Sequence, residues 1–379
     1  MKAGTKAIHV GHGSEGTAPL VTPITLASTF TWENLHQEPE YVYTRYTNPS
    51  RTELEKILAS LENGRFCTCY ASGMAAMTAA FSALQAGDHV LIASDIYGGT
   101  SFFAAQEFER SGIQWSEFDA ICLESVEEVA RPNTKMIVFE TPTNPVLRLA
   151  DISAIAKLAK SKGWISVLDN TFASPILQNP LEYGIDVVMH SLTKYINGHS
   201  DLIGGALITN SEALGERFFK YAKTAGANLG PFEAYLTVRG VRTLNVRMRE
   251  HCKNAMGLAE YFKGAKRVRK VYYPGLKEHP GHELAARQMK GGFGGMLAIE
   301  LDATAEETSR IAKSLKIFSV AASFGGVESI ISYPMQMSHK MVSDAEKLAK
   351  GVTPSLLRIS AGIEDLEDLI ADWEQALKA

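Results

Sequence analysis

The sequence predicts an α/β protein with a large, mostly parallel sheet, helices on both of its faces, and a smaller α+β domain at the C-terminal end. Between residues 64 and 210, short β-branched runs alternate with helical patterns, which is typical of parallel strands joined by helices. After about residue 245 the pattern changes, and the first 45 residues show little helical periodicity. We therefore expect an N-terminal arm over 1–46, a large domain over 47–245 and a C-terminal domain over 246–379.

The composition is that of an ordinary globular protein and disfavours several classes of function. The 379 residues carry a net charge of −4, which gives no reason to expect nucleic acid or an anionic membrane as a partner. Apolar runs stay well short of the roughly 20 residues that cross a bilayer, and residues 1–6 lack the apolar core of a signal peptide. Four cysteines make no disulfide framework and show no zinc-ligand spacing, so we expect a cytoplasmic protein without a metal site.

The first regular element is a helix after the arm, followed by a series of strands. Ser50 and Glu53 have the spacing of a capping box, so we expect the helix to begin there and to end at Gly64. Its buried face is expected to hold Leu54, Ile57, Leu58 and Leu61. Six apolar runs then predict strands at Phe66–Tyr70, Val90–Ala93, Met136–Glu140, Ile165–Asp169, Ile185–Met189 and Ala206–Thr209. Helical patterns between them include Met74–Leu84 and Ile152–Lys162.

The C-terminal domain is predicted from further strands and a final helix. Strand-like runs occupy Met296–Leu301 and Leu356–Ser360, and Val271–Tyr273 follows a basic segment that we interpret as solvated surface. The last helix is expected to carry Glu364 and Asp365 in its first turn, where acidic side chains are favourable. Its inward face is expected to hold Leu366, Leu369, Ile370, Trp373 and Leu377.

Polar side chains follow the first three of these strand ends, where open α/β sheets bind their ligands. Ser72 and Gly73 open a helix whose backbone N–H groups can bind a phosphate, although a serine N-cap alone also explains them. Tyr97 precedes two glycines and either stacks on an aromatic cofactor or lies on a surface turn. Asn144 lies between two prolines, as a substrate-positioning amide or as part of a stiff turn.

The next two strand ends carry the groups that indicate one cofactor. Asp169 ends an apolar strand, where an ionised carboxylate is costly unless it is paired. A protonated pyridine nitrogen is such a partner, and a cap on the next turn is the alternative. Lys194 follows Ser191 and Thr193, so an amine able to form a Schiff base with pyridoxal 5'-phosphate (PLP) comes directly after two possible phosphate ligands. A solvated lysine is the alternative there, but five successive strand ends with suitable groups together predict a PLP site.

Motifs of other cofactor classes fail their context. Residues 11–16 fit the G-x-G-x-x-G pattern, but a proline-bearing extended segment follows instead of a helix. We therefore do not expect a dinucleotide site or a nicotinamide-dependent dehydrogenase. The sequence also lacks G-x-x-x-x-G-K-[ST], which disfavours a P-loop NTPase.

Motifs along nearly the whole chain resemble the Cys/Met-metabolism family of PLP enzymes. This family includes cystathionine γ-lyases, β-lyases and γ-synthases, methionine γ-lyases and O-acylhomoserine sulfhydrylases. The motifs are Tyr43–Pro49, Ser72–Met74, Asp95–Gly99, Thr141–Pro145, Asp169–Asn170, Ser191–Lys194, Ser323–Ser329 and Leu357–Gly362. Together they are specific for the family and less specific for the member.

The resemblance implies PLP fold type I and a homotetramer built of two dimers with shared active sites. Tyr43 and Arg45 of the arm would then reach the cofactor phosphate of the neighbouring subunit. The residues that the resemblance implies at the cofactor are Tyr43, Arg45, Ser72, Gly73, Met74, Tyr97, Asp169, Ser191, Thr193 and Lys194.

The resemblance also implies the groups that hold and transform the substrate. Arg358 would bind the α-carboxylate of an amino acid, assisted by Asn144, Ser323 and Tyr43, and a structural salt bridge is the alternative for this arginine. The implied catalytic residues are Lys194 as base and proton shuttle, Asp169 as partner of the ring nitrogen, and Tyr97 as ring stacker and proton donor to the departing sulfur.

Three positions depart from known members of the family. Gly99 replaces a cysteine of methionine γ-lyases, and Phe102 stands where γ-lyases often carry arginine. Ala322 replaces the glutamate that grips the distal amino group of cystathionine in γ-lyases and γ-synthases. The distal pocket is therefore expected to be more apolar than that of a strict cystathionine γ-lyase.

We predict a C–S lyase that converts L-cystathionine to cysteine, 2-oxobutanoate and ammonia by γ-elimination. β-Elimination is one alternative, since Ser323–Gly325 and Met337–His339 also resemble plant-type β-lyases. A γ-replacing synthase or sulfhydrylase is another, and a non-catalytic binding module is the competing class.

Overall fold

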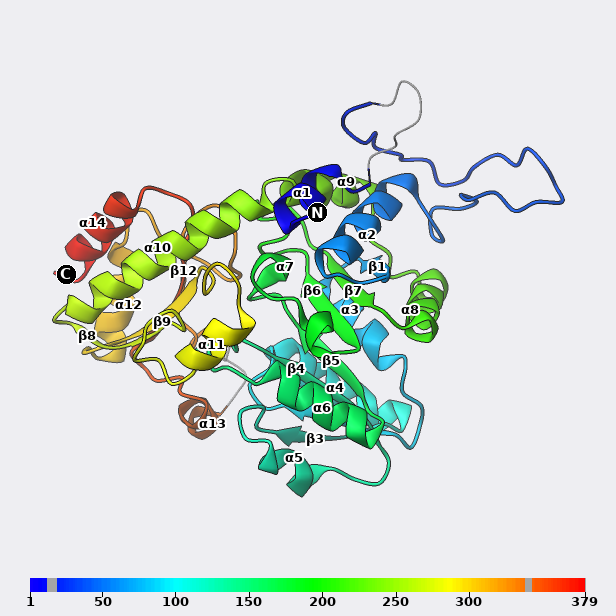
Figure 1. The fold of residues 1–379 in the computed structure, drawn as a ribbon. Helices are drawn as coiled ribbons and strands as arrows, with labels where there is room; N and C mark the ends of the chain where they lie inside the picture. The colour runs from blue at the N-terminus through cyan, green and yellow to red at the C-terminus, as the bar shows by residue number, and fades with distance from the viewer. Residues whose placement is uncertain (12–18, 338–342, 379) are drawn as a thin grey trace.

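The computed structural model describes residues 1–11, 19–337 and 343–378, which form two sheets surrounded by helices (Figure 1). The larger sheet has seven strands in the order β1-β7-β6-β5-β4-β2-β3. Strands β2 to β6 pair in parallel, whereas β7 is antiparallel to both of its neighbours, so the sheet is mixed and mostly parallel as predicted. The strands are β1 Phe66–Tyr70, β2 His89–Ala93, β3 Gln114–Phe118, β4 Thr134–Glu140, β5 Ile165–Asp169, β6 Val187–Ser191 and β7 Gly205–Thr209.

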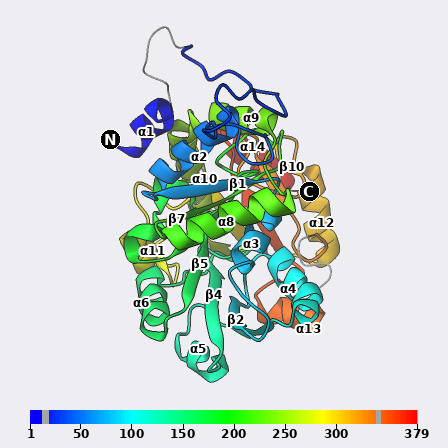
Figure 2. The same cartoon turned by 90° about the vertical axis from the view of Figure 1, so that its right-hand side faces the viewer.

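Helices cover both faces of the large sheet, because its strands bury side chains on both sides. In β6, Val187 and Met189 belong to one buried apolar cluster, whereas Val188 belongs to another. The first cluster includes side chains of α3 Gly73–Phe81, α4 Gly98–Ser111, α6 Ile152–Lys162 and α8 Glu212–Ala225. The second includes side chains of α2 Pro49–Leu61, α7 Ser174–Leu177, α9 Pro231–Val241 and α10 Leu244–Gly264. Figure 2 shows α8 crossing one face of the large sheet beside β1 and β7. Two short helices, α5 Glu124–Val129 and η1 Pro180–Tyr183, lie in the connections between strands.

The smaller sheet has five strands in the order β10-β11-β12-β9-β8. Its core contains Phe262 of α10 and Trp373 of α14, whose rings meet edge to face at 4.9 Å. The strands are β8 Val268–Tyr272, β9 Met296–Leu301, β10 Ser319–Val320, β11 Ile330–Ser332 and β12 Leu356–Ser360, of which β9 and β12 match the predicted ranges. The helices are α11 His282–Gln288, α12 Ala305–Ser314, α13 Asp344–Ala349 and α14 Leu366–Ala376.

The large sheet and its helices differ from the prediction in several bounds and in one strand. Strands β2, β4 and β7 begin one or two residues earlier than predicted, β6 ends at Ser191 rather than Met189, and α3 spans Gly73–Phe81 rather than Met74–Leu84. Strand β3 was not expected, because at this edge of the sheet its polar residues outnumber its apolar ones and Phe118 alone is buried. Strand β6 begins at Val187 rather than Ile185. The reason is that the Asp186 carboxylate accepts the Ser166 N–H at 2.9 Å, which takes the place of a ladder hydrogen bond.

The start of α2 also differs from the prediction. The predicted capping box is wrong, because Asn48 is the N-cap and its side chain accepts from the Ser50 N–H at 2.9 Å. Ser50 Oγ instead accepts from the Thr25 N–H at 3.0 Å, and Glu53 pairs with Arg242 at 3.1 Å. The helix ends at Leu61, three residues before the expected Gly64, and Glu62 is its C-cap. Its predicted apolar face is buried as expected.

The last helix begins later than predicted. Asp365 is the N-cap of α14, and the first turn contains Glu367 and Asp368 instead. Glu364 lies before the helix, because its carboxylate accepts from the N–H and hydroxyl of Ser329 at 2.6 and 2.8 Å. Leu369 and Trp373 are fully buried, as the apolar pattern predicted.

The arm contains a helix that was not predicted, α1 Ala3–His9, which lies against α2 and α10. Lys6 Nζ donates to the Ser60 carbonyl at 2.7 Å, and Ala7 is buried. From residue 19 to α2 the chain has no helix and extends away from both sheets (Figure 1). Most of the G-x-G-x-x-G segment, and Ser338 and His339, lie outside the described residues. None of the described helices is long and apolar enough to span a bilayer.

Candidate active site

The first predicted site residues lie where α3 meets the ends of β6 and β7. Ser72 is the N-cap of α3, and its hydroxyl accepts from the Ala75 N–H at 3.0 Å. A Cβ added to Gly73 would lie 3.1 Å from Ser191 Cβ, and one added to Gly205 would lie 2.2 Å from the Ser72 carbonyl oxygen. Both glycines therefore permit a close approach of backbone at the positive end of a helix, which suits a phosphate. The N-cap alternative and the phosphate interpretation are compatible here.

Asp169 and Ser191 are linked through Thr171, a residue that the sequence analysis did not select. Thr171 Oγ donates to Asp169 Oδ1 at 2.5 Å and accepts from the Ser191 N–H at 2.9 Å. Burial raises the pKa of Asp169, while the Thr171 hydrogen bonds and the charges of His190 and Lys194 oppose that rise. A buried carboxylate under this balance suits a cationic partner such as a protonated ring nitrogen.

Lys194 lies in the turn after β6, close to the smaller sheet. Its Nζ donates to Ser323 Oγ at 2.7 Å and lies 5.2 Å from the centre of the Phe324 ring. Burial lowers the pKa of Lys194 to about 8, with the Arg358 charge acting in the same direction and Asp169 opposing it. Thr193, in the same turn, accepts from the Gly204 N–H at 3.1 Å. The amine is therefore far easier to deprotonate than that of a solvated lysine.

Arg358 is a buried cation on β12. Its two terminal nitrogens donate to Asn144 Oδ1 at 2.9 Å and to the Ser323 carbonyl at 2.8 Å. Among the described residues no carboxylate forms an ion pair with it, and its Nε has no hydrogen-bond partner. The salt-bridge alternative therefore has no partner in the described chain. A buried guanidinium in this state suits a carboxylate ligand.

Ser323 connects Lys194 to Arg358, since its hydroxyl meets the amine and its carbonyl meets the guanidinium. Its φ is 83°, in the left-handed region that residues other than glycine, asparagine and aspartate rarely adopt. Its neighbour Phe324 packs against Phe172 at 4.4 Å between ring centres and is also 5.7 Å from the Arg358 guanidinium. Backbone strain of this kind collects at functional sites.

Tyr97, Met74 and Gly99 lie together at the start of α4. A Cβ added to Gly99 would lie 2.4 Å from Tyr97 Cε1 and 3.1 Å from Met74 Sδ. The Tyr97 side chain is half exposed, and its backbone N–H donates to Glu140 Oε2 at 3.0 Å. The cysteine that methionine γ-lyases carry at this position would thus crowd the tyrosine ring in the conformation seen here.

Glu140 is a site residue that the sequence analysis missed. It ends β4 in register with Asp169 at the end of β5, and it is buried. Burial, followed by the charges of Asp169 and Asp95, raises the pKa of Glu140 well above its ordinary value. The available signal was the one used for Asp169, a carboxylate that closes an apolar strand.

Two predicted residues are not brought to this group. Arg45 donates to the Lys223 carbonyl at the end of α8 and lies 5.7 and 5.0 Å from the ring centres of Tyr43 and Tyr46. Tyr43 is 41% exposed. Within one chain, both residues therefore lie in the arm, where Arg45 contacts the end of α8 and Tyr43 contacts Arg45 and Tyr46.

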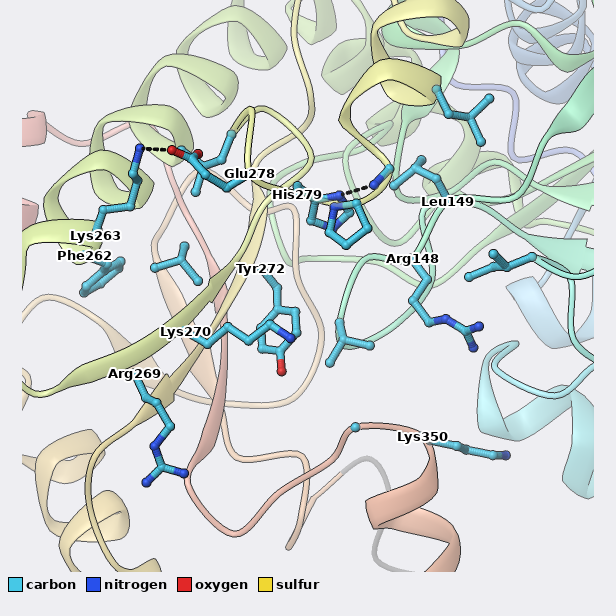
Figure 3. A pocket seen from close by; sticks show the side chains of 18 of the residues that line it. Arg148, Leu149, Phe262, Lys263, Arg269, Lys270, Tyr272, Glu278, His279 and Lys350 are labelled. Carbon is cyan, nitrogen blue, oxygen red and sulfur yellow. Dashed lines mark hydrogen bonds and ion pairs between the residues drawn. The ribbon is translucent and has the colours of Figure 1, made fainter.

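A cavity of about 1010 Å³ lies in a different place, between the loop after β4 and the strand β8 (Figure 3). Arg148 and Leu149 line one side, Lys270 and Tyr272 the other, and Lys350 a third. None of the predicted site residues lines it. The chemistry of the strand ends, rather than the volume of this cavity, therefore identifies the candidate active site.

Comparison with known proteins agrees with this geometry. A family model described as Cys/Met metabolism PLP-dependent enzyme matches residues 4–378. The chain is 42% identical to a cystathionine gamma-lyase of Bacillus subtilis (strain 168), with 100% of both chains covered, and 45% identical to a cystathionine gamma-synthase of Mycobacterium bovis, with 98% and 96% covered. A solved cystathionine gamma synthase from Xanthomonas oryzae pv. oryzae, in complex with aminoacrylate and cysteine, matches with a TM-score of 0.96 at 38% identity and covers 100% of this chain and 98% of that chain. The fold is PLP fold type I, and the chain belongs to the Cys/Met metabolism family of PLP-dependent enzymes.

Proposed function

We propose that this enzyme is a C–S lyase that converts L-cystathionine and water to cysteine, 2-oxobutanoate and ammonia by γ-elimination. The observation that carries the proposal is the group formed by Lys194, Ser323 and Arg358. The readily deprotonated amine of Lys194 and the guanidinium of Arg358, which has no carboxylate partner among the described residues, both donate hydrogen bonds to Ser323. This spacing suits an α-amino acid, whose carboxylate and α-carbon are adjacent. The B. subtilis relative supports γ-elimination by its name and full coverage.

The proposed roles follow from the chemistry of each side chain. PLP, when bound, withdraws electrons from the substrate α-carbon. Arg358 and Asn144 would bind the carboxylate, and neutral Lys194 would accept the proton from the α-carbon and act as the proton shuttle. Asp169 would keep the proton on the cofactor ring nitrogen, and Tyr97 would stack on the ring and donate a proton to the departing sulfur. Ser72, Gly73, Met74, Ser191 and Thr193 complete the cofactor site, and Ser323 supports the carboxylate.

We also propose the assembly that the sequence predicts, a homotetramer of two dimers, with Tyr43 and Arg45 reaching the cofactor and substrate of the neighbouring subunit. Exposed apolar side chains along the arm support it, among them Leu20, Leu26 and Leu35. The division into residues 1–46, 47–245 and 246–379 is proposed with it, supported by two separate sheets. Four free cysteines support a cytoplasmic location.

Identification of the products from L-cystathionine tests the function. Cysteine with 2-oxobutanoate is the expected result, whereas homocysteine with pyruvate would make the enzyme a β-lyase. The Lys194→Ala variant is expected to be inactive and Lys270→Ala, whose lysine lines the separate cavity, to be unaffected. Turnover by Lys194→Ala would contradict the assignment of the amine.

γ-Replacement is the second candidate, because the M. bovis γ-synthase is 45% identical to this chain. Formation of cystathionine from an O-acylhomoserine and cysteine, faster than cystathionine is cleaved, would favour it over the lyase. If cystathionine is neither cleaved in the first assay nor formed in the second, the search would turn to another thioether.

A further inference from the structure

A buried polar network lies at the ends of β5 and β6 and is not used by the proposed chemistry. It consists of Glu62, Asn170, Gln178 and His190, which we call the back-face network. Each of these side chains is at most 1% exposed. Buried polar groups are costly unless they are hydrogen-bonded, and most polar atoms of this network are; among the described residues Gln178 Oε1 and His190 Nδ1 have no partner.

Glu62 is the centre of the network and comes from the end of α2, far away in sequence. Its Oε1 accepts from Asn170 Nδ2 at 2.8 Å and is 2.5 Å from His190 Nε2, so a proton lies between the carboxylate and the ring. The amides of Asn170 and Gln178 are joined, since Gln178 Nε2 donates to Asn170 Oδ1 at 2.9 Å. Gln178 Nε2 also donates to the Thr141 carbonyl at 3.1 Å. One carboxylate therefore links the ends of β5 and β6, and its amide partners reach the end of β4.

The network lies on the face of the sheet opposite to the candidate site. Side chains alternate between the faces of a strand, so Asn170 and His190 point away from Asp169 and Ser191, which precede and follow them. Contacts agree with this alternation, because His190 meets α2 on one side while Ser191 lies beside Gly73 of α3 on the other. The Asn170 N–H donates to the Met189 carbonyl at 3.0 Å, which continues the pairing of the two strands beyond Asp169.

Two layers thus hold the same pair of strand ends. On the front face, Thr171 joins Asp169 to Ser191. On the back face, Glu62 joins Asn170 to His190. Asp169 is the proposed partner of the cofactor ring nitrogen, and Ser191 is a proposed ligand of its phosphate. These two groups lie at opposite ends of one molecule.

We propose that Glu62 is a positioning residue. Through Asn170 and His190 it sets the distance between Asp169 and Ser191, and thereby the position of the bound cofactor. Glu62 touches neither cofactor nor substrate and acts through the strand ends. The His190 charge also opposes the rise in the pKa of Asp169 that burial causes, which adds an electrostatic effect in the same place. This inference rests on the proposed roles of Asp169 and Ser191.

The test measures PLP dissociation from the purified holoenzyme of Glu62→Leu, together with the visible circular dichroism of the bound cofactor. We expect the dissociation constant to rise at least about tenfold, the lower end of the cost of losing comparable supporting contacts at metal sites. The dichroism per bound cofactor is expected to fall, because a less fixed ring gives a weaker signal. Glu62→Gln keeps an oxygen that can accept from Asn170 and His190, so it is expected to restore most of both quantities.

Asp372→Asn is the matched control for a general loss of stability. Asp372 is also a buried acid, 5% exposed, and it accepts from the backbone N–H groups of Lys316 and Ile317 at 2.9 and 2.8 Å beside the smaller sheet. We expect it to lower the melting temperature while cofactor affinity stays within about twofold. A Glu62→Leu protein that binds PLP within twofold of wild type, with unchanged dichroism, would overturn the proposal.

A second variant keeps the proposal testable if Glu62→Leu does not fold. Asn170→Ala removes the amide between Glu62 and Gln178 and is expected to weaken cofactor binding at least about fivefold. Unchanged affinity in Asn170→Ala would also overturn the proposal. If the wild-type protein itself bound no PLP, the proposed function would fail first, and the two failures are therefore distinguishable.

Discussion

Burial acts on three charged residues of the site in one direction, toward their neutral forms. It lowers the pKa of Lys194 to about 8, lowers that of Arg358 to about 10 and raises that of Asp169. Each charged form is therefore less stable in the protein than in water. Ligands that supply the opposite charge, or that react with the neutral amine, gain from this imbalance. This is the electrostatic basis on which the site would take up an anionic, amine-reactive cofactor and an amino-acid carboxylate.

The pKa of Lys194 predicts how cofactor loading depends on pH. The neutral amine would react with the aldehyde of PLP, and the neutral fraction of Lys194 is one half at about pH 8 and nearly complete only at about pH 9 and above. The rate of PLP uptake by the cofactor-free protein is therefore expected to rise between about pH 6 and pH 9 and to level off above that. Absorbance of the bound cofactor follows this rate. A rate that still climbs toward the ordinary lysine value of 10.5 would contradict the lowered pKa.

Arg358→Lys tests the role of the planar guanidinium. Lysine keeps the charge but cannot maintain two directed hydrogen bonds while it pairs with a carboxylate, so kcat/KM for the amino-acid substrate is expected to fall about 100-fold. Cofactor affinity is expected to stay the same. Steady-state kinetics and PLP titration measure the two effects, and Arg269→Lys at the exposed pair with Asp302 provides the control. An unchanged kcat/KM would remove Arg358 from substrate binding.

At the scale of elements, the sequence predicts best where burial decides the structure. Strands β1 and β5, which are largely buried, have the predicted bounds, as does α6 with its apolar stripe. Edge strand β3 was missed because its residues contact solvent as much as the core. The cap of α2 could not be predicted because Ser50 is taken by Thr25, a contact between separate segments.

The candidate site divides in the same way. Lys194, Asp169 and Asn144 follow strand ends, so their proximity could be expected from the general geometry of parallel sheets. The link from Lys194 through Ser323 to Arg358 joins residues more than a hundred positions apart and could not be derived from spacing. Glu140 and Thr171 were missed for a simpler reason. In the sequence each can be read as an ordinary residue at a strand end, and only the contacts of Glu140 with Tyr97 and of Thr171 with Asp169 place them in the site.

The contact between α3 and β7 predicts the effect of one methyl group. In Gly205→Ala the added carbon would lie 2.2 Å from the Ser72 carbonyl oxygen and 2.9 Å from Gly73 Cα, so the first turn of α3 must move. We expect a loss of about 1–3 kcal/mol in unfolding free energy and weaker PLP binding. Gly264→Ala, at the end of α10 with nothing within 4 Å of the added carbon, is the control. Denaturant melts measure both, and equal stabilities would contradict the close approach.

At the scale of the whole molecule, the N-terminal arm is the part that has no evident role within a single chain. It places Arg45 against the end of α8 and Tyr43 beside Arg45, whereas Lys194 of the same chain contacts Ser323 and Phe324. A symmetric dimer contacts each partner with the same surface, so an arm that reaches across would complete both sites at once. The proposed shared sites account for the exposed apolar residues of the arm.

Mixing two inactive variants tests the shared site. Arg45→Ala and Lys194→Ala are each expected to have little activity alone. In a randomly reassembled mixture, half of the dimers would combine the two and carry one intact site, which gives about one quarter of wild-type activity. Lys194→Ala alone, taken through the same dissociation and reassembly, is the control. No recovery after demonstrated subunit exchange would show that Arg45 serves its own chain.

The bond between Arg358 and Asn144 joins β12 of the smaller sheet to the loop after β4 of the larger one. A carboxylate held there would be gripped from both sheets, and recognition would be a property of their junction rather than of either sheet. A chain whose sheets had folded but not yet come together would possess its reactive lysine and no means of holding an amino acid beside it. The bound substrate would then hold the two sheets together. Saturating amounts of a carboxylate-bearing analogue would therefore make the two sheets unfold in a single thermal transition.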